Sequence, residues 1–221
     1  MLKVTVDKRK IFDEVFRRLS VNGVLLLFDS SFPSVTTIVS KQRIKGSWWS
    51  HADAQTIFEV CEMLEDHPDV LVIKLISNKV TFVHRELWQR VYSVAVARDE
   101  WQLKGLSPAA QRLLKKLDQS GFLETNKLDK SFGSKPGDIA RELEARLLLN
   151  SQQVHTSSGA HTKRLETWNA WAKRIGFKVR AKDSAAARLY LEQRVMSIGS
   201  RATLPWSKYF RKCSITEQSN D

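Results

Sequence analysis

The sequence predicts an α+β fold in two domains followed by a tail, and three observations carry this prediction. Apolar residues recur at helical spacing in some segments and form short β-branched runs in others. Turn-forming pairs such as Asn22-Gly23 and Ser77-Asn78 separate these segments. Charge is uneven, because residues 1–100 carry 14 Lys+Arg against 13 Asp+Glu, whereas residues 101–221 carry 22 against 11. We therefore expect a first domain over 1–100 and a differently charged second one.

The first domain contains the pattern of a helix followed by two strands twice. The expected helices run over residues 8–20 and from Ser50 to Leu64, and the expected strands over 24–28, 34–40, 70–76 and 79–84. Ser50 and Asp53 form a candidate cap pair for the second helix, which His67-Pro68-Asp69 ends. A further helix carries Leu87, Val91, Val94 and Ala95.

The two copies of this pattern align. Ile11-Phe12 precedes Val24 by the same distance as Ile57-Phe58 precedes Val70. This spacing predicts two helix–hairpin units that share a four-stranded sheet. Chance alignment of apolar residues is the rival explanation, because both helices and strands are apolar on one face.

The second domain, over residues 101–198, begins with a helix over 107–120. Ser107-Pro108 opens that helix and Gly121 ends it. The segments expected next are a weak helix or loop over 124–132, a helix over 138–150, a hairpin turning at Ser158-Gly159, a helix over 165–175, a strand over 177–181 and a helix over 184–196. Helix, connector, helix and basic hairpin is the order of a winged helix. Residues 199–221 are expected to be a mostly flexible basic and aromatic tail.

Several short motifs of the second domain carry a family resemblance. They are Leu147-Leu-Leu149, His155-Thr156, Gly159, His161 and Trp168-Asn-Ala-Trp171-Ala. In these motifs the segment resembles the C-terminal winged-helix module of the bacterial DNA glycosylases that unhook alkylated and crosslinked bases. The resemblance covers about a third of the chain and implies DNA binding. The catalytic Gln-x-Gln or Gln-x-Asp pair of those enzymes is absent from this sequence, where Gln152 and Gln153 are adjacent.

Positive charge is concentrated near the end of the chain. Residues 163–212 hold 13 basic against 3 acidic residues. Such a concentration attracts polyanions by counterion release, so duplex DNA is the expected partner, and RNA is the other nucleic acid that this charge suits. A membrane is not expected as a partner, because no segment pairs a basic face with a strongly apolar one. The alternative is that the charge only keeps the protein in solution.

The residues expected to contact nucleic acid lie in the hairpin, the helix before it and the segment after it. The hairpin offers hydroxyl and basic groups suited to phosphate oxygens, and Gly159 allows close approach. The solvent face of helix 138–150 is expected to comprise Arg141, Glu142, Glu144, Ala145 and Arg146, whose mixed sign indicates weak sequence readout. The full set is His155, Thr156, Ser157, Ser158, Gly159, His161, Thr162, Lys163, Arg164, Lys173, Arg174, Lys178, Arg180, Lys182, Arg141 and Arg146.

His155 and His161 flank the tip of the hairpin and are expected to face each other across it. Two histidines without a third ligand make a poor metal site, so no metal is expected. The sequence also contains no phosphate-binding glycine-rich loop, no cysteine pair with zinc spacing and no Gly-x-Ser-x-Gly turn. No cofactor is expected.

Trp48 and Trp49 are the most unusual pair of the first domain. Adjacent side chains of a regular strand or helix cannot both enter one core, so one of them is a candidate to stack on a base or to wedge into a duplex. His51 and Asp53 would then be the groups that act on a water or a sugar. The alternative is that both tryptophans are packed between the two hairpins while Ser50 caps the following helix.

These observations favour a duplex DNA-binding protein that works in repair or transcription. The first alternative is a glycosylase-like enzyme that presents Trp48, Trp49, His51 and Asp53 to a flipped base. The second is an adaptor for other proteins, since a helix of mixed charge also suits a protein surface. The first residues contain no apolar run of signal-peptide length, so the expected location is the cytoplasm, or the nucleoid in a bacterium. The sequence does not indicate an oligomeric state.

Overall fold

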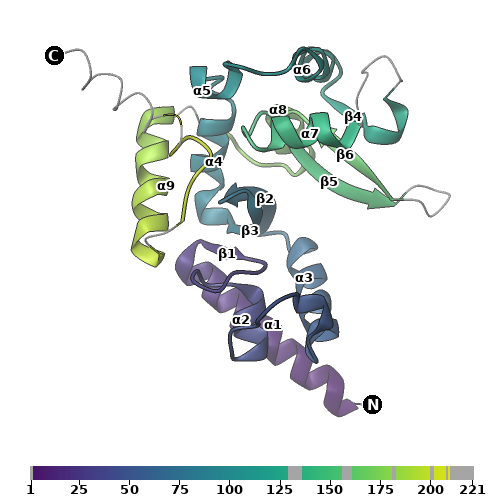
Figure 1. Ribbon diagram of the computed structural model, residues 1–221, viewed down its shortest axis with the longest axis vertical. Coiled ribbons are helices and arrows are strands. Elements are labelled where there is room, and N and C mark those ends of the chain that lie inside the picture. The colour runs from purple at the N-terminus through teal and green to yellow at the C-terminus, as the bar shows by residue number, and fades with distance from the viewer. Residues whose placement is uncertain are drawn as a thin grey trace. The chain divides into compact units, whose positions relative to one another are not determined.

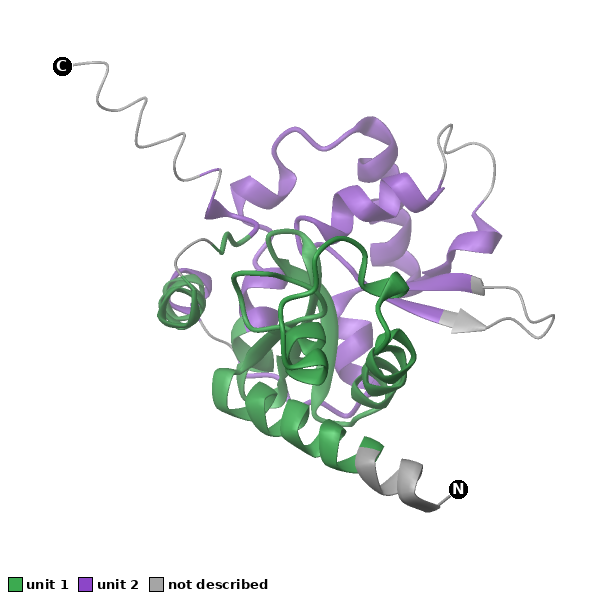
Figure 2. Cartoon of the chain, turned by 60° about the horizontal axis from the view of Figure 1, so that its bottom comes forward, with its two compact units in different colours: residues 1–90, 188–204 green, residues 91–187, 205–221 purple. Residues whose placement is uncertain are grey.

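The structure of this chain is a computed structural model that describes residues 2–128, 136–155, 161–180, 183–199, 202–207 and 209 (Figure 1). Within these residues it is an α+β protein with two three-stranded antiparallel sheets, and the α+β class agrees with the prediction. The chain divides into two compact units (Figure 2). The first comprises residues 1–90 and 188–204, and the second residues 91–187 and 205–221. The division differs from the predicted boundaries chiefly in assigning 188–204 to the first unit.

Among the described residues, the first unit contains helices α1, α2 and α3, most of α9, and one sheet. Its elements are α1 (Leu2–Asn22), β1 (Val24–Leu26), α2 (Val35–Ser40), the 3₁₀ turn η1 (Trp48–Ser50), α3 (Ala54–Glu65), β2 (Val70–Ile76), β3 (Lys79–His84) and the 3₁₀ turn η2 (Arg85–Leu87). Two helices, α4 (Trp88–Ala95) and α9 (Ser184–Ile198), cross from one unit to the other along the chain. No helix of the described residues is both long enough and apolar enough to cross a membrane.

The sheet of the first unit has the order β1-β3-β2. The β2–β3 hairpin is predicted correctly, including its turn at Ser77-Asn78. Both turn residues have positive φ, 51° and 57°, which is the geometry of the two-residue turns that match strand twist. Leu25 and Phe82 are register partners and belong to the core formed with α1 and α3, whereas Leu71 and Val83 face the opposite side and are also buried. The sheet is therefore covered on both faces.

Residues 34–40 were expected to form a strand, and this prediction is wrong, because Val35–Ser40 is helix α2. Ser34 and Thr37 form a capping box: the Thr37 amide donates to Ser34 Oγ at 3.4 Å, and the Ser34 amide donates to Thr37 Oγ1 at 3.3 Å. These bonds satisfy orphan amides of the helix start and outweigh the weak strand preference of Val, Ile and Thr. The predicted four-stranded sheet is therefore wrong as well.

The predicted cap pair at the start of α3 is also wrong. Ser50 lies in η1 and donates its hydroxyl to the Ser47 carbonyl at 2.9 Å. Asp53 precedes the helix without capping it by its side chain, and its amide donates to His51 Nδ1 at 3.2 Å. Hydrogen bonds between neighbouring residues, Ser50 to Ser47 and Asp53 to His51, thus hold the turn before α3, and Ser50 does not cap the helix.

The second unit begins inside α4. It contains α5 (Glu100–Leu103), α6 (Pro108–Ser120), β4 (Phe122–Glu124), the 3₁₀ turn η3 (Thr125–Lys127), α7 (Pro136–Glu144), β5 (Asn150–His155), β6 (His161–Glu166) and α8 (Trp168–Arg174). The sheet order is β4-β6-β5. Helices α6 and α7 share one apolar core with residues of β6, including Leu113, Leu143 and Leu165. This core fixes the base of the β5–β6 hairpin, which projects from the body of the unit (Figure 1).

The start and end of α6 agree with the sequence prediction. Ser107 Oγ accepts from the Ala110 amide at 3.2 Å, Pro108 occupies the first helical position, and Gly121 follows the helix with φ 76°. Helix α7, by contrast, ends at Glu144, several residues before the predicted Asn150. Leu147 adopts φ 54° and turns the chain toward β5. Residues with side chains rarely adopt a positive φ, so the helical spacing of the leucines did not predict this turn.

Two further expectations need correction, and one strand was not expected. That strand is β4, Phe122–Glu124, whose last residue begins the segment 124–132; the next described residues of this segment form the turn η3 and Leu128, in agreement with a weak helix or loop. Residues 177–180 form no strand. The tail is partly packed, because Leu204 and Trp206 are buried and the Ser77 amide donates to the Thr203 carbonyl at 2.7 Å. The end of the tail, 210–221, lies outside the described residues.

Candidate nucleic-acid interface

The β5–β6 hairpin is the segment predicted to contact phosphates. Its register pairs Asn150 with Glu166 at the base and His155 with His161 at the far end, so the two histidines lie opposite each other in the backbone, as expected. The tip itself, which includes Thr156, Ser157, Ser158 and Gly159, lies outside the described residues. The described part of the proposed interface is therefore the body of the hairpin and the elements packed against it.

Lys163 of β6 forms an ion pair with Glu144 at the end of α7. The Lys163 Nζ to Glu144 Oε1 distance is 3.0 Å, and Ser151 Oγ donates to the same oxygen at 2.6 Å. Glu144 is only 7 % exposed, so the prediction that it lies on the solvent face of its helix is wrong. A buried carboxylate needs a partner for its charge, and Lys163 supplies it. The Lys163 ammonium group is therefore held beside the end of α7.

Arg164 and Arg174 share the carboxylate of Glu166, which is almost fully buried. Arg174 Nε donates to Glu166 Oε1 at 2.9 Å and to Oε2 at 3.1 Å, and Arg164 forms an ion pair with Oε1. The Arg164 guanidinium also lies over the Phe122 ring, 4.2 Å from its centroid. About a third of each arginine side chain remains exposed, 31 % for Arg164 and 36 % for Arg174. One buried anion thus orients two guanidinium groups that still reach solvent.

Thr162 has a structural contact in place of the expected phosphate contact. Its side chain is buried, its hydroxyl lies 3.1 Å from that of Thr125, and it accepts from the Asn126 amide at 3.3 Å. These bonds fasten β6 to η3. The sequence offered no sign of this, since the partners are 37 and 36 residues away.

The two arginines of the α7 region have different surroundings. Arg141 is exposed and pairs with Asp138 at 2.9 Å. Arg146 donates through Nη1 to the carbonyls of Trp101, Gln102 and Lys104, the last at 2.6 Å. These carbonyls belong to α5 and the turn after it, so Arg146 joins two segments of the unit.

The last turn of α8 and the segment after it carry further exposed cations. Lys173, Lys178 and Arg180 are exposed, and neither lysine forms an ion pair with any described residue. Lys182, predicted to belong with them, lies outside the described residues. Because Arg174 is next to Lys173, these lysines continue the positive surface that starts at the Glu166 arginines.

Trp48 and Trp49 divide between core and surface. Trp48 is 8 % exposed and belongs to the core of the first unit, whereas Trp49 is 63 % exposed. The expectation that one of the pair reaches solvent is therefore confirmed, and the alternative that both are packed is wrong. His51 Nδ1 lies 3.5 Å from Asp53 Oδ2 and accepts from the Asp53 amide at 3.2 Å, so this pair serves the turn before α3.

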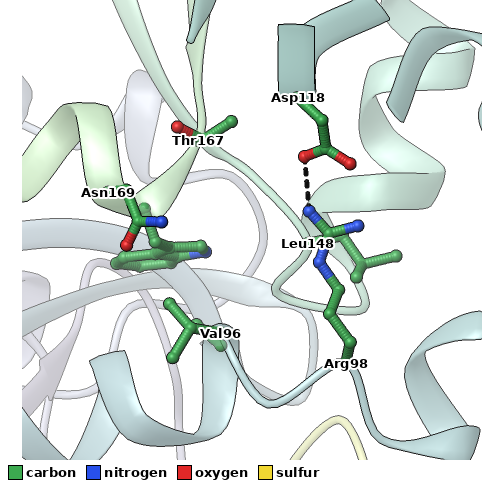
Figure 3. A pocket seen from close by; sticks show the side chains of 8 residues that line it. Val96, Arg98, Asp118, Leu148, Thr167 and Asn169 are labelled. Carbon is green, nitrogen blue, oxygen red and sulfur yellow. Dashed lines mark hydrogen bonds and ion pairs between the residues drawn. The ribbon is translucent and has the colours of Figure 1, made fainter. Parts of the chain in front are cut away.

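A pocket of about 220 Å³ in the second unit was not foreseen from the sequence (Figure 3). Its lining includes Val96, Arg98, Asp118, Thr167 and Asn169, and Arg98 donates to Asp118 at 2.6 Å. Arg98 has φ 56°, an unusual backbone conformation for a residue with a side chain. Its guanidinium is neutralised by the aspartate, and the pocket is smaller than typical small-molecule sites. No sequence motif marks these residues, which come from separate segments of the chain.

The chain matches no protein-family model, no curated protein and no solved structure.

Proposed function

We propose that this protein binds duplex DNA in the cytoplasm through its second unit, a winged-helix domain, mainly by contacts to phosphates. The proposal is supported by the order of elements, α6, β4, α7, β5 and β6, and by the sheet order β4-β6-β5, which are those expected of a winged helix. The projecting β5–β6 hairpin corresponds to the wing. Sequence readout is weak in this proposal, because Arg141 on α7 is already paired with Asp138.

The arrangement around Glu166 is the observation that carries the proposal. A guanidinium group has five N–H donors, and the bonds of Arg174 to Glu166 use its Nε, which leaves both terminal nitrogens to bind a phosphate. Because Glu166 already orients the two arginines, little side-chain entropy remains to be lost when a phosphate binds. Arg164 is further fixed by Phe122. Lys173 and Lys178 extend this surface with charge that no described carboxylate neutralises.

Removal of the two lysines tests the proposal in the full-length chain. The double variant Lys173→Ala, Lys178→Ala is expected to weaken binding to all duplex sequences alike. The slope of log affinity against log salt is expected to fall by about 0.9 for each phosphate that the variant no longer neutralises. These lysines are preferable to Lys163 and Arg164, whose removal would take an ion-pair partner from the buried Glu144 and Glu166.

The matched control is Lys10→Ala, Arg17→Ala on α1, which removes the same charge from exposed positions of the first unit. Its salt slope is expected to equal that of the unchanged protein. A slope that stays the same in the Lys173, Lys178 variant would contradict the proposed surface. Equal losses of affinity in both variants would show that net charge alone governs binding, and an absence of DNA binding would favour the adaptor alternative.

A further inference from the structure

Trp49 presents an aromatic surface to solvent on the first unit. Its ring stacks on that of Trp48, with 3.9 Å between centroids and 26° between planes. Trp48 is part of the core, so it holds Trp49 in a fixed orientation while 63 % of Trp49 stays exposed. Phe58 of α3, which is 39 % exposed, lies beside it at 6.1 Å between centroids. Trp48 therefore covers part of the Trp49 ring, while most of the Trp49 side chain remains accessible to solvent.

The loop that precedes the tryptophans is basic. Lys41, Arg43 and Lys45 are exposed, and none of them forms an ion pair with a described residue. Ile44, between them, is buried in the same core as Trp48, which anchors the loop. Lys45 is four residues from Trp49, so their Cα atoms are within about 14 Å of each other. Lys45 thus lies near the exposed ring, and Arg43 and Lys41 precede it on the same loop.

The carboxylate of α3 nearest to Phe58 in sequence does not cancel this charge. Glu59 forms an ion pair with Lys8 at 2.5 Å and accepts a hydrogen bond from Gln55 at 2.8 Å. These bonds lower the pKa of Glu59, with the Gln55 bond as the larger cause and Lys8 as the second. The carboxylate therefore stays ionised and already has its counterion.

We infer that the first unit binds single-stranded DNA, with a base stacked on Trp49 and the adjoining phosphates held by Lys41, Arg43 and Lys45. Aromatic rings beside cations are the usual means of binding unpaired strands without sequence preference. A duplex does not offer this contact, because its base faces are already stacked on one another. The choice of DNA over RNA rests on the proposed function, which assigns DNA to the second unit.

The variant Trp49→Ala tests the stacking contact in the full-length chain with an oligothymidylate as the probe. Its affinity is expected to fall by about tenfold or more, since stacking on one aromatic ring contributes on that order per base. Because the side chain is exposed, the thermal unfolding midpoint is expected to stay the same. Val21→Ala is the matched control, with a residue of the same unit that is 64 % exposed, and its affinity is expected to be unchanged.

A second measurement uses Trp49→Phe, which keeps an aromatic ring but removes the indole. Oligothymidylate is expected to quench tryptophan fluorescence of the unchanged protein and to quench this variant less, while the affinity falls less than in Trp49→Ala. Equal affinity of Trp49→Ala and the unchanged protein would overturn the stacking contact.

The basic loop is tested by the triple variant Lys41→Ala, Arg43→Ala, Lys45→Ala. For a single strand the salt slope is expected to fall by about 0.7 for each phosphate that the loop no longer neutralises. Duplex affinity in this variant is expected to be unchanged. The Lys173, Lys178 variant should bind duplex more weakly, and adding Trp49→Ala to it should still lower its affinity for oligothymidylate. The duplex measurements therefore test the proposed function, and the oligothymidylate measurements test the single-strand site. An unchanged slope overturns the role of the loop, and tighter binding of oligouridylate than of oligothymidylate overturns the choice of DNA.

Discussion

Asp29 is a single residue that holds the turn between β1 and α2. Its Oδ1 accepts from the Ser31 amide at 2.7 Å and the Phe32 amide at 2.8 Å, and Lys79 Nζ donates to its Oδ2 at 2.6 Å. Burial by itself would raise the pKa of Asp29. The hydrogen bonds from Lys79 and the two amides outweigh burial and lower the pKa from 3.8 to about 2.

This shift predicts a specific dependence of stability on pH. A carboxyl whose pKa is lower in the folded state stabilises the fold above its unfolded pKa, here 3.8, and this contribution is lost as pH falls toward 2. Asp29→Asn is expected to destabilise the first unit at pH 7 by on the order of 2 kcal/mol and to reduce the loss of stability between pH 4 and pH 2. Urea unfolding at several pH values measures both effects. A variant with the same acid sensitivity as the unchanged protein would contradict the assignment to Asp29.

Individual site residues could be predicted only where their role is local. The exposure of one tryptophan in Trp48-Trp49 follows from their adjacency, and the structure agrees. The roles of Glu144 and Arg146 do not follow from the helix pattern, because both depend on the turn at Leu147 and on partners such as Ser151 and Lys104. Long-range pairing of this kind leaves no periodic signal in a sequence.

At the scale of elements, the start of α2 shows how one side chain decides between helix and strand. Ser34 is fully buried, and its hydroxyl lies within hydrogen-bonding distance of the Asp29 carbonyl and of the Thr36 and Thr37 side chains. It also accepts from the Thr37 amide. The residues that follow, Val35 to Ser40, are β-branched for the most part and would not start a helix by propensity alone.

Ser34→Ala is therefore expected to destabilise the first unit by about 1 to 2 kcal/mol, the usual cost of losing a helix cap. The measurement is the midpoint of urea unfolding. Ser50→Ala is the control, because the exposed Ser50 hydroxyl donates to the Ser47 carbonyl and to no other described residue, and its removal should change stability by less than about 0.5 kcal/mol. Equal effects of the two substitutions would mean that the capping box does not hold α2.

The elements that the sequence predicts well are those with local signals at both ends. The β2–β3 hairpin has two apolar runs around Ser77-Asn78, and α6 has Ser107-Pro108 at its start and Gly121 at its end. Strand β4 was missed because three residues, Phe122–Glu124, are too few to show alternation. Its strand identity comes from pairing with β6, whose partner residues Arg164 to Glu166 come much later in the chain.

At the scale of the whole molecule, the first unit depends on a late segment of the chain. Gly199, just after α9, lies against the buried ring of Phe32, and a Cβ added there would be 2.8 Å from Phe32 Cδ2. Arg194 of the same segment donates to the Val21 carbonyl and to Glu86, both at 3.0 Å. Residues 188–204 thus contribute to the packing of the first unit as well as to its hydrogen bonds.

Gly199→Ala is expected to destabilise the first unit by about 1 to 3 kcal/mol, because the added methyl group must displace Phe32. Thermal unfolding measures the effect. Gly137→Ala in α7 is the control, since the nearest atom to its added Cβ is 3.9 Å away and alanine favours the helix. A Gly199→Ala variant that unfolds with the midpoint of the unchanged protein would show that the segment is loosely packed against Phe32.

The discontinuity of the first unit has a consequence for synthesis on the ribosome. Residues 91–187 emerge between the two parts of the first unit, so they are an insertion within it. The second unit can therefore assemble its helices and hairpin while the sheet β1-β3-β2 still lacks the segment that carries Arg194 and Gly199. The part of the protein that is made first must therefore wait for a late segment, and until residue 204 has emerged its incomplete surface is exposed to chaperones and proteases.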